Sequence, residues 1–258
     1  MNRGETIIVT CGLWLSFALG LLTGCQPQQV KSLKLMSYNI RNGIGLDDSV
    51  NYQRISAVIV EEAPQVVALQ EVDSVTGRSK GVDVLALLGQ ETQLHPTYAA
   101  AIPFDGGKYG IGILSKEKPL SVRQLALPGR EEARVLLLAE FDDYLFASTH
   151  LSLTTEDRMA SLSLIREVSA VANKPFFIAG DWNAEPQSPF IEDLTRDFVL
   201  LTDTADYTYP ADMPNRCIDY IAGYAAKVCS FSKDTSYVSE EPLASDHRPV
   251  VSVIHIKK

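Results

Sequence analysis

The sequence predicts an α/β fold in which two packed β-sheets are covered by outer helices. A strand–helix–strand arrangement occurs twice, strand-like segments lie between the two copies, and the strands are apolar on both faces, as in sheets covered on both sides. A single doubly wound sheet is the alternative. The 258 residues are 46% apolar and 21% charged and contain no evident internal linker, which is typical of one globular domain.

The individual elements are predicted from hydrophobic periodicity and turn residues. In the helix of the second unit, apolar residues recur at three-residue steps, which places them on one face. The first unit is predicted at Leu33–Asn39, Asn51–Glu62 and Gln65–Glu71, and the second at Tyr144–His150, Glu156–Ala172 and Pro175–Asp181. The remaining strands are predicted at Thr97–Ile102, Tyr109–Ser115, Val122–Ala126, Arg134–Phe141 and Arg248–Ile256, with a hairpin at Cys217–Ser230 centred on Gly223.

The first residues resemble an export signal. Ile7–Leu22 is apolar but too short and interrupted for a good membrane span, and it ends in "LTGC", which resembles a bacterial lipoprotein box. On that resemblance residues 1–24 are a signal peptide, Cys25 is lipidated, and 25–32 are the lipidated cysteine and its tether. A plain secretory signal is the alternative. We expect a domain at 33–258, exported and anchored to a bacterial membrane, facing the periplasm or the cell surface.

Two cysteines remain in the mature chain besides Cys25. Cys217 and Cys229 flank the predicted hairpin, and directly opposed positions there could form a disulfide in an exported protein. Two buried free thiols are the alternative, and the sequence leaves both open. Neither cysteine has the spacing of a zinc knuckle.

The charge of the chain indicates whether nucleic acid is a favoured binding partner. The formal net charge is −9, and no cluster of Lys and Arg stands out. Because affinity for a nucleic-acid backbone depends on neutralising phosphates, nucleic acid is not the favoured partner, although a bound cation and a few local basic residues could serve a small contact.

Polar residues gather where predicted strands stop. Ligand sites of parallel sheets form at the carboxyl ends of strands, so several strands that end in polar residues indicate one site at a shared rim. The last strand reaches this rim if it runs antiparallel. The residues are Asn39, Glu71, His150 and Asp181 at the ends of four strands, and Asp246 and His247 at the start of the last.

One further residue, Asp219, is picked out by its surroundings. Asp219 lies inside the strand pattern "CIDYI", where an unpaired carboxylate would be costly, and His247 is its natural partner. Such a carboxylate fixes the imidazole and favours its charged form. We expect His150 and His247 to be the functional histidines, and His95 and His255 to be structural or solvent-facing.

The stretch "GDWNAEP" has two readings to exclude. It matches the ligand spacing of an EF-hand from Asp181, but Pro186 stands where the loop needs glycine and a β-like segment precedes it. An ordinary acidic turn would fit the stretch alone. In extended backbone, however, Asp181 and Asn183 point to one side, toward the rim, while Trp182 points into the core.

The ordered set of motifs resembles one known family. These motifs are "SYNIR" at 37–41, "LQEVD" at 69–73, "YGIGILS" at 109–115, "THL" at 149–151, "GDWNAEP" at 180–186, "IDYI" at 218–221 and "SDHRPV" at 245–250. In this order they resemble the endonuclease/exonuclease/phosphatase superfamily, with the deoxyribonuclease I-like fold. The resemblance implies a four-layer sandwich of two mixed β-sheets with outer helices. It also implies hydrolysis of phosphoesters with Mg²⁺, for which Mn²⁺ could substitute.

The resemblance also implies roles for individual residues. Glu71 would be the main Mg²⁺ ligand, with Asn39 beside it and Asp246 near the metal. Asp181 would orient and deprotonate the attacking water, helped by Asn183. His247, held by Asp219, would stabilise charge on the phosphoryl oxygens, His150 would bind the phosphate, and Tyr109 and Arg41 would contact the substrate.

These inferences together predict a monomeric, lipid-anchored, Mg²⁺-dependent phosphoesterase acting on a small or lipid-like phosphodiester or phosphomonoester. Phosphoryl transfer depends mainly on positioning and charge stabilisation, which this residue set could supply. An exported nuclease is the alternative enzyme, and a zinc hydrolase using the two histidines is a more distant one. A degenerate surface binding module is the alternative from another class.

Overall fold

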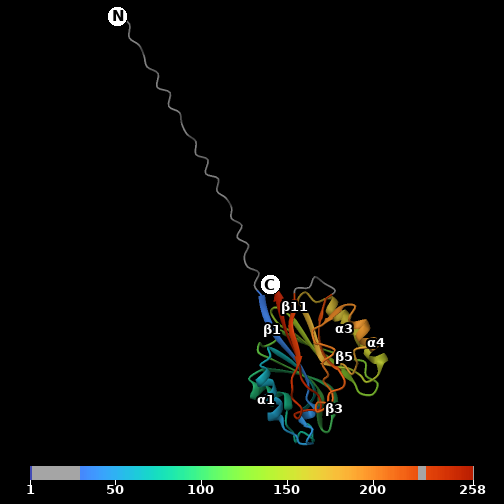
Figure 1. The fold of residues 1–258 in the computed structure, drawn as a ribbon. Coiled ribbons are helices and arrows are strands. Elements are labelled where there is room, and N and C mark those ends of the chain that lie inside the picture. Colours follow the sequence, from blue (N-terminus) through green and yellow to red (C-terminus); the bar gives the residue numbers. More distant parts are fainter. Residues whose placement is uncertain (2–29, 226–230, 258) are drawn as a thin grey trace.

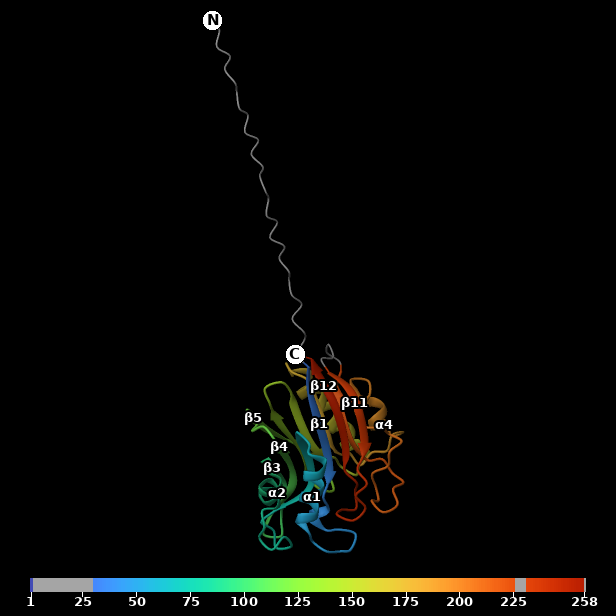
Figure 2. The same ribbon diagram turned by 60° about the vertical axis from the view of Figure 1, so that its left-hand side comes forward.

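The computed structural model describes Met1, residues 30–225 and residues 231–257. Two six-stranded mixed sheets pack face to face, with helices on the outside (Figures 1 and 2). The first sheet has the order β11 (Phe231–Val238), β12 (Val250–Lys257), β1 (Val30–Asn39), β2 (Val66–Ser74), β4 (Gly107–Ser115) and β3 (His95–Phe104). The second has the order β5 (Ser121–Leu127), β6 (Arg134–Glu140), β7 (Leu145–His150), β8 (Phe176–Asp181), β10 (Asp219–Tyr224) and β9 (Phe198–Leu200).

The two strand–helix–strand units are confirmed, one in each sheet. α1 (Tyr52–Glu62) connects β1 to the parallel strand β2, and α3 (Thr155–Ala170) connects β7 to the parallel strand β8. β12 runs antiparallel to β1, as expected, so its first residues lie at the carboxyl end of β1. The fold therefore brings the ends of the central strands to one rim.

Three apolar clusters lie between the layers of the fold and hold them together. One fills the space between the two sheets, and the other two lie between each sheet and its outer helices. A sheet whose two faces are both buried has apolar residues on both faces, which is the pattern visible in the sequence. The four-layer sandwich is confirmed.

Two shorter helices, one short strand and β11 were not predicted from the sequence. α2 (Val84–Thr92) begins where the Asp83 side chain accepts from the amide of Ala86, and α4 (Pro189–Leu194) is only six residues long. β9 has three residues. Elements of one or two turns contain too few residues to show a period.

The hairpin predicted around Gly223 is wrong. Gly223 lies inside β10, paired with Phe177 of β8, and β11 belongs to the other sheet. The glycine serves close packing, because a Cβ there would lie 2.4 Å from the ring of Phe231. Cys217 is buried, and Cys229 lies outside the described residues, so the disulfide stays a prediction whose assumed hairpin is absent.

The first strand begins earlier than the predicted start at Leu33. β1 starts at Val30, where it pairs with Lys257, at the end of the sheet remote from the rim. The expected signal peptide and Cys25 lie outside the described residues. None of the helices in the described ranges is long and apolar enough to span a membrane.

Gly180 is a position where the fold leaves no room for a side chain. A Cβ at residue 180 would lie 2.0 Å from the carbonyl oxygen of Thr149 on the neighbouring strand. Gly180→Ala should therefore lower the free energy of unfolding by about 1–3 kcal/mol, measured by urea denaturation. Gly106→Ala is the control, because its surroundings are open and only its positive φ of 78° opposes a side chain. Equal stability of Gly180→Ala and wild type would contradict this packing.

Candidate active site

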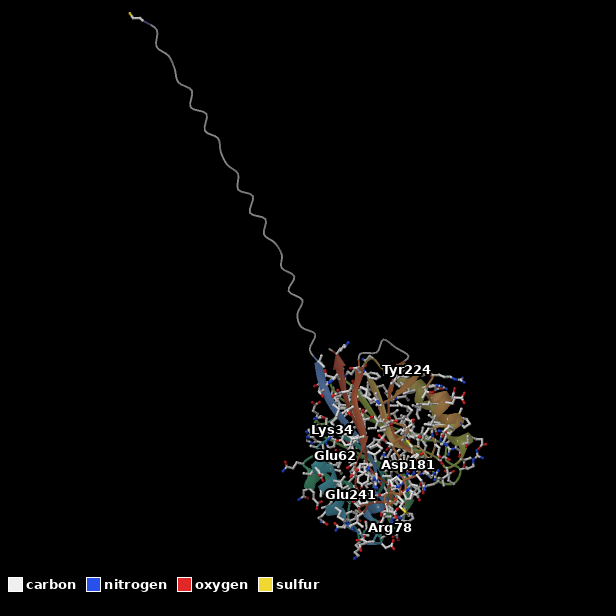
Figure 3. The ribbon with its side chains drawn as sticks, in the orientation of Figure 1. Lys34, Glu62, Arg78, Asp181, Tyr224 and Glu241 are labelled. Carbon is white, nitrogen blue, oxygen red and sulfur yellow. The ribbon has the colours of Figure 1, made fainter. Side chains whose placement is uncertain are left out.

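The polar residues predicted from strand ends do meet at one rim. A cleft of about 390 Å³ opens there. In Figure 3, Tyr224 at the end of β10 lies toward the end of the domain where the chain enters, and Asp181 lies farther from it. Of the predicted site residues, Glu71, Tyr109, His150, Asp181, Asn183, Asp246 and His247 line the cleft, and Asn39 and Asp219 support them from behind.

Glu71 reaches the cleft through a bulge rather than from a strand end. β2 continues to Ser74, and its register with β4 is irregular between Leu69 and Val72. Glu71 itself has a φ of 59°, in the left-handed region. A bulge turns a side chain out of the regular alternation, and here it directs the carboxylate to the rim. The prediction that the strand ends at Glu71 is therefore wrong, although its position at the site is right.

Asn39 links the two halves of the site. Its side-chain Nδ2 donates to Oε1 of Glu71 at 3.0 Å and to Oδ2 of Asp181 at 3.1 Å. Its Oδ1 accepts from the amide of Arg41 at 3.1 Å. With this orientation Asn39 positions the two carboxylates. Burial, followed by the nearby charges of Asp181 and Asp246, raises the pKa of Glu71, against the opposing hydrogen bond from Asn39.

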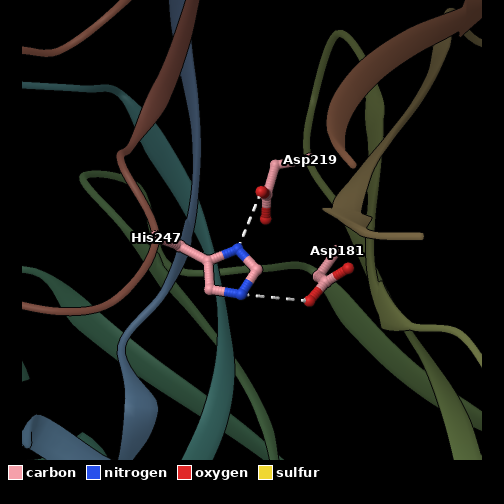
Figure 4. A group of neighbouring side chains, drawn as sticks. All are labelled: Asp181, Asp219 and His247. Carbon is pink, nitrogen blue, oxygen red and sulfur yellow. Dashed lines mark hydrogen bonds and ion pairs between the residues drawn. The ribbon is translucent and has the colours of Figure 1, made fainter. Parts of the chain in front are cut away.

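Asp219, His247 and Asp181 form a chain of contacts (Figure 4). His247 Nδ1 lies 2.8 Å from Oδ2 of Asp219, and its Nε2 lies 3.7 Å from Oδ2 of Asp181. Thr208 Oγ1 also donates to Oδ2 of Asp219, at 2.6 Å. The predicted partnership of Asp219 and His247 is thus present, and it fixes which ring nitrogen faces the cleft.

The pKa values of the two histidines beside Asp181 are shifted in opposite directions. His150 Nε2 lies 3.5 Å from Oδ2 of Asp181, and burial lowers the pKa of His150 to about 4. Burial also opposes charge on His247, but the carboxylates of Asp219 and Asp181 outweigh it and raise the pKa of His247 to about 10. At neutral pH His150 is therefore uncharged and His247 is a cation. Environments that separate pKa values in this way define acid and base roles.

The residues after β8 are arranged as expected, with one difference. Trp182 is fully buried and stacks on Tyr220, with ring centroids 4.9 Å apart. Asn183 has a φ of 50° rather than extended backbone. Its amide donates to Oδ1 of Asp181, and its Nδ2 donates to the carbonyl of Leu151. The side chain of Asn183 is thereby held at the cleft wall.

Arg41 contacts Asp246 instead of lining the cleft. Its Nε lies 3.7 Å from Oδ2 of Asp246. Arg41, Asn42 and Gly43 all have positive φ, a strained turn of the kind found at functional sites. Arg41 thus offsets charge on a residue of the cleft wall, and its contact with the substrate stays a prediction. Tyr109 does line the cleft, and Arg78 lies over its ring at 5.2 Å.

Two groups of side chains could hold a divalent metal. Asp181, Asp219 and His247 offer ligand atoms within 4.8 Å of one another. His247 would have to give up its proton to coordinate, and its Nδ1 is already engaged by Asp219. The other group is Glu71 with Asp246, which supplies only the hard oxygen ligands that Mg²⁺ prefers. The donor chemistry of the second group fits Mg²⁺ better.

A family model matches residues 36–252, which is most of the described domain. It is the model of the endonuclease/exonuclease/phosphatase family. The chain belongs to this family. Membership confirms the resemblance seen in the motifs and supports hydrolysis of phosphoester bonds as the activity. No curated protein matches the chain in sequence.

Solved structures share the fold of this family member. A family protein from Bacteroides thetaiotaomicron is 17% identical, with a TM-score of 0.72 over 90% of this chain and 97% of its own. A mannosyl-6-phosphatase from the same species is 16% identical, with a TM-score of 0.68 over 86% and 99%. TDP2 of D. rerio, complexed with a single-strand DNA product, is 18% identical, with a TM-score of 0.67 over 86% and 98%.

Several residues of this family member's cleft were missed by sequence reasoning. An arginine that begins an apolar strand looks like an ordinary solvent-facing residue, and Tyr209 and Arg216 lie in a segment without periodicity. Tyr209 packs its ring against His247, with centroids 4.8 Å apart. The missed cleft-lining residues are Glu132, Arg134, Leu153, Tyr209, Arg216 and Ile218.

The shifted pKa of His247 predicts a pH dependence of stability. Its folded value, about 10, lies above the ordinary 6.5, so the ion pair with Asp219 stabilises fully below about pH 6.5 and is lost as pH rises through 10. Between these values the free energy of unfolding should fall more steeply for wild type than for His247→Asn. Urea denaturation in EDTA at several pH values measures this. Parallel profiles for the two proteins would contradict the ion pair.

Proposed function

We propose that the chain is an exported, lipid-anchored, Mg²⁺-dependent phosphoesterase that hydrolyses a small, soluble phosphodiester or phosphomonoester. The observation that carries this proposal is Asp181 held between a charged His247 and an uncharged His150, beside Glu71, in one cleft. A carboxylate that can accept a proton next to a fixed cation is suited to attack by water on a phosphoryl group.

Glu71 and Asp246 would hold the Mg²⁺, and the bound ion would polarise the phosphoryl oxygens as a Lewis acid. The protein's own side chains accept the proton, orient the water and stabilise the developing charge. Asp181 takes the proton of the attacking water, and Asn183 orients that water beside it. His247, kept charged by Asp219, stabilises the negative charge that develops on the phosphoryl oxygens. A donor of this kind lowers the barrier by about 3 kcal/mol.

Size and charge favour a small substrate. A cleft of about 390 Å³ is within the usual range for small-molecule sites. The net charge of −9 opposes binding of a long polyanion. Among the proteins of similar fold, a mannosyl-6-phosphatase shows that the fold can act on a sugar phosphate, whereas TDP2 with its DNA product keeps the nuclease alternative open.

The position of β1 favours a soluble substrate over a lipid of the anchoring membrane. β1 has ten residues and runs from Val30 to the rim, a length of roughly 33 Å. From Cys25 to Val30 the chain spans five residue steps, at most about 18 Å. If Cys25 is lipidated, this tether is too short to pass along the domain and let the cleft face the bilayer.

A substrate panel tests the proposed function. Full-length protein in mild detergent, stripped with EDTA, is assayed with Mg²⁺, Mn²⁺ or Zn²⁺ on p-nitrophenyl phosphate, bis-p-nitrophenyl phosphate, sugar phosphates and plasmid DNA. We expect Mg²⁺- or Mn²⁺-dependent hydrolysis of the small phosphoesters. No hydrolysis of any substrate would reject the enzyme, equal and salt-sensitive cleavage of DNA would favour the nuclease, and recovery with Zn²⁺ alone would favour the zinc hydrolase.

The short tether gives a separate prediction. Full-length protein reconstituted in vesicles should hydrolyse soluble phosphoesters as fast as it does in detergent. It should leave phospholipids and sphingomyelin of its own vesicle intact. A variant with about twenty Gly/Ser residues inserted after Gln29, roughly 25 Å of added flexible reach, is the matched control. Hydrolysis of lipids in the vesicle by the unmodified protein would contradict the soluble substrate.

A further inference from the structure

We propose that Arg134 binds the phosphoryl oxygens of the substrate directly, and that Glu132 holds its guanidinium until the substrate arrives. This inference deepens the proposed phosphoesterase function and rests on it. It assigns a second fixed cation to the cleft, in addition to His247.

Arg134 is a buried cation at the cleft. It is the first residue of β6, and its side chain is only 7% exposed, although arginine is rarely buried without a partner. It lines the main cleft together with His150 and Tyr109, and the same three residues line a small cavity against the sheet. The guanidinium therefore lies on the wall of the site, between the two sheets.

The hydrogen-bonding capacity of Arg134 is incompletely used. Its Nη1 lies 2.9 Å from Oε1 of Glu132. Its Nη2 lies 3.8 Å from Oε1 of Glu131, an oxygen that already accepts the amide of Leu153 at 2.7 Å. Its Nε is buried without a hydrogen-bond partner. A guanidinium has five N–H donors arranged as a fork, so this one has donors to spare for a ligand.

The chemistry of these spare donors points to a phosphoryl group. The fork of arginine matches two oxygens of a phosphate, and it remains charged at every relevant pH. Besides Glu132, the cleft contains three carboxylates, those of Glu71, Asp181 and Asp246, which would repel an anionic substrate. Arg134 offsets part of that charge, and His150, being uncharged at neutral pH, does not.

Glu132 is suited to release Arg134. It lies on the same cleft wall, and its side chain is 30% exposed, so water can solvate the carboxylate when the ion pair opens. A phosphate that replaces Glu132 keeps the buried guanidinium paired, and the displaced carboxylate is left in water rather than buried without a partner. Arg216, another cleft-lining cation, is 44% exposed and paired with Glu185, and it is therefore a poorer candidate for the same contact.

Arg134→Gln should weaken binding of inorganic phosphate by about 10–100-fold, the range expected for charge-assisted hydrogen bonds. KM for p-nitrophenyl phosphate should rise with it. Binding is measured by calorimetry on full-length protein with Mg²⁺ present. Glu132→Gln should have the opposite effect, tightening phosphate binding several-fold, because the competing carboxylate is removed.

Arg130→Gln is the matched control. Arg130 lies on the loop that leads into β6, is 61% exposed and pairs with Asp157 away from the cleft, so phosphate affinity should stay unchanged. If Arg134→Gln is unstable, Arg134→Lys and Glu132→Gln test the contact with the charge at 134 retained; Lys should bind phosphate more weakly than Arg. Phosphate affinity at the wild-type level in a folded Arg134→Gln, or weaker binding in Glu132→Gln, would overturn the assignment. Absence of hydrolysis by wild type, with phosphate binding that follows these variants, would instead reject the proposed reaction.

Discussion

Asp181→Asn should lower kcat by about 10²–10⁴-fold without unfolding the protein, because the substitution keeps the shape of the side chain and removes its proton acceptor. Oδ2 of Asp181 is the point on which the site converges. It lies 3.1 Å from Nδ2 of Asn39, 3.5 Å from Nε2 of His150 and 3.7 Å from Nε2 of His247. The side chain of Asp181 is buried, so a carboxylate ion from the solution could not take its place in the Asn variant.

The measurement is steady-state hydrolysis of a p-nitrophenyl phosphoester, with thermal unfolding as the test of folding. Asp157→Asn is the matched control, because Asp157 is also a buried carboxylate but pairs with Arg130 outside the cleft. We expect this control to lose a little stability and to keep its kcat. A folded Asp181→Asn protein with undiminished turnover would show that another group accepts the proton, and His150, uncharged at neutral pH, would be the first to examine.

Much of this site could be predicted because strands bring their ends together. Asn39, His150 and Asp181 are the last residues of β1, β7 and β8, and these are strands of the two parallel pairs. Once the strand–helix–strand units are recognised, their polar ends must meet at the rim of their sheet. Asp219 was predictable for another reason, since a carboxylate within an apolar strand requires a partner.

Other features depended on tertiary contacts that the sequence does not display. The bulge at Glu71 depends on the register of β2 against β4, which no local pattern encodes. Gly223 resembles a turn residue in the sequence, but the position requires glycine because Phe231 of the other sheet packs against it. Arg134 was missed because burial distinguishes it from a surface arginine, and burial is a property of the fold.

The second large effect that we expect comes from substitution of a metal ligand. Glu71→Gln should lower the affinity for Mn²⁺ by at least about tenfold and reduce kcat accordingly. Glu71 offers a carboxylate at the cleft whose contact with Asn39 leaves further lone pairs available. Calorimetric titration with Mn²⁺ alone measures the affinity and does not depend on catalysis.

Asp219→Asn is the informative comparison, because it separates the two candidate donor groups. If the ion lies with Glu71 and Asp246, this variant should bind Mn²⁺ normally and still lose turnover, since His247 would lose the carboxylate that keeps it charged. If the ion lies among Asp181, Asp219 and His247, Asp219→Asn should abolish Mn²⁺ binding and Glu71→Gln should preserve it. We expect the first result, because a protonated imidazole cannot coordinate a metal and Nδ1 of His247 is already engaged by Asp219.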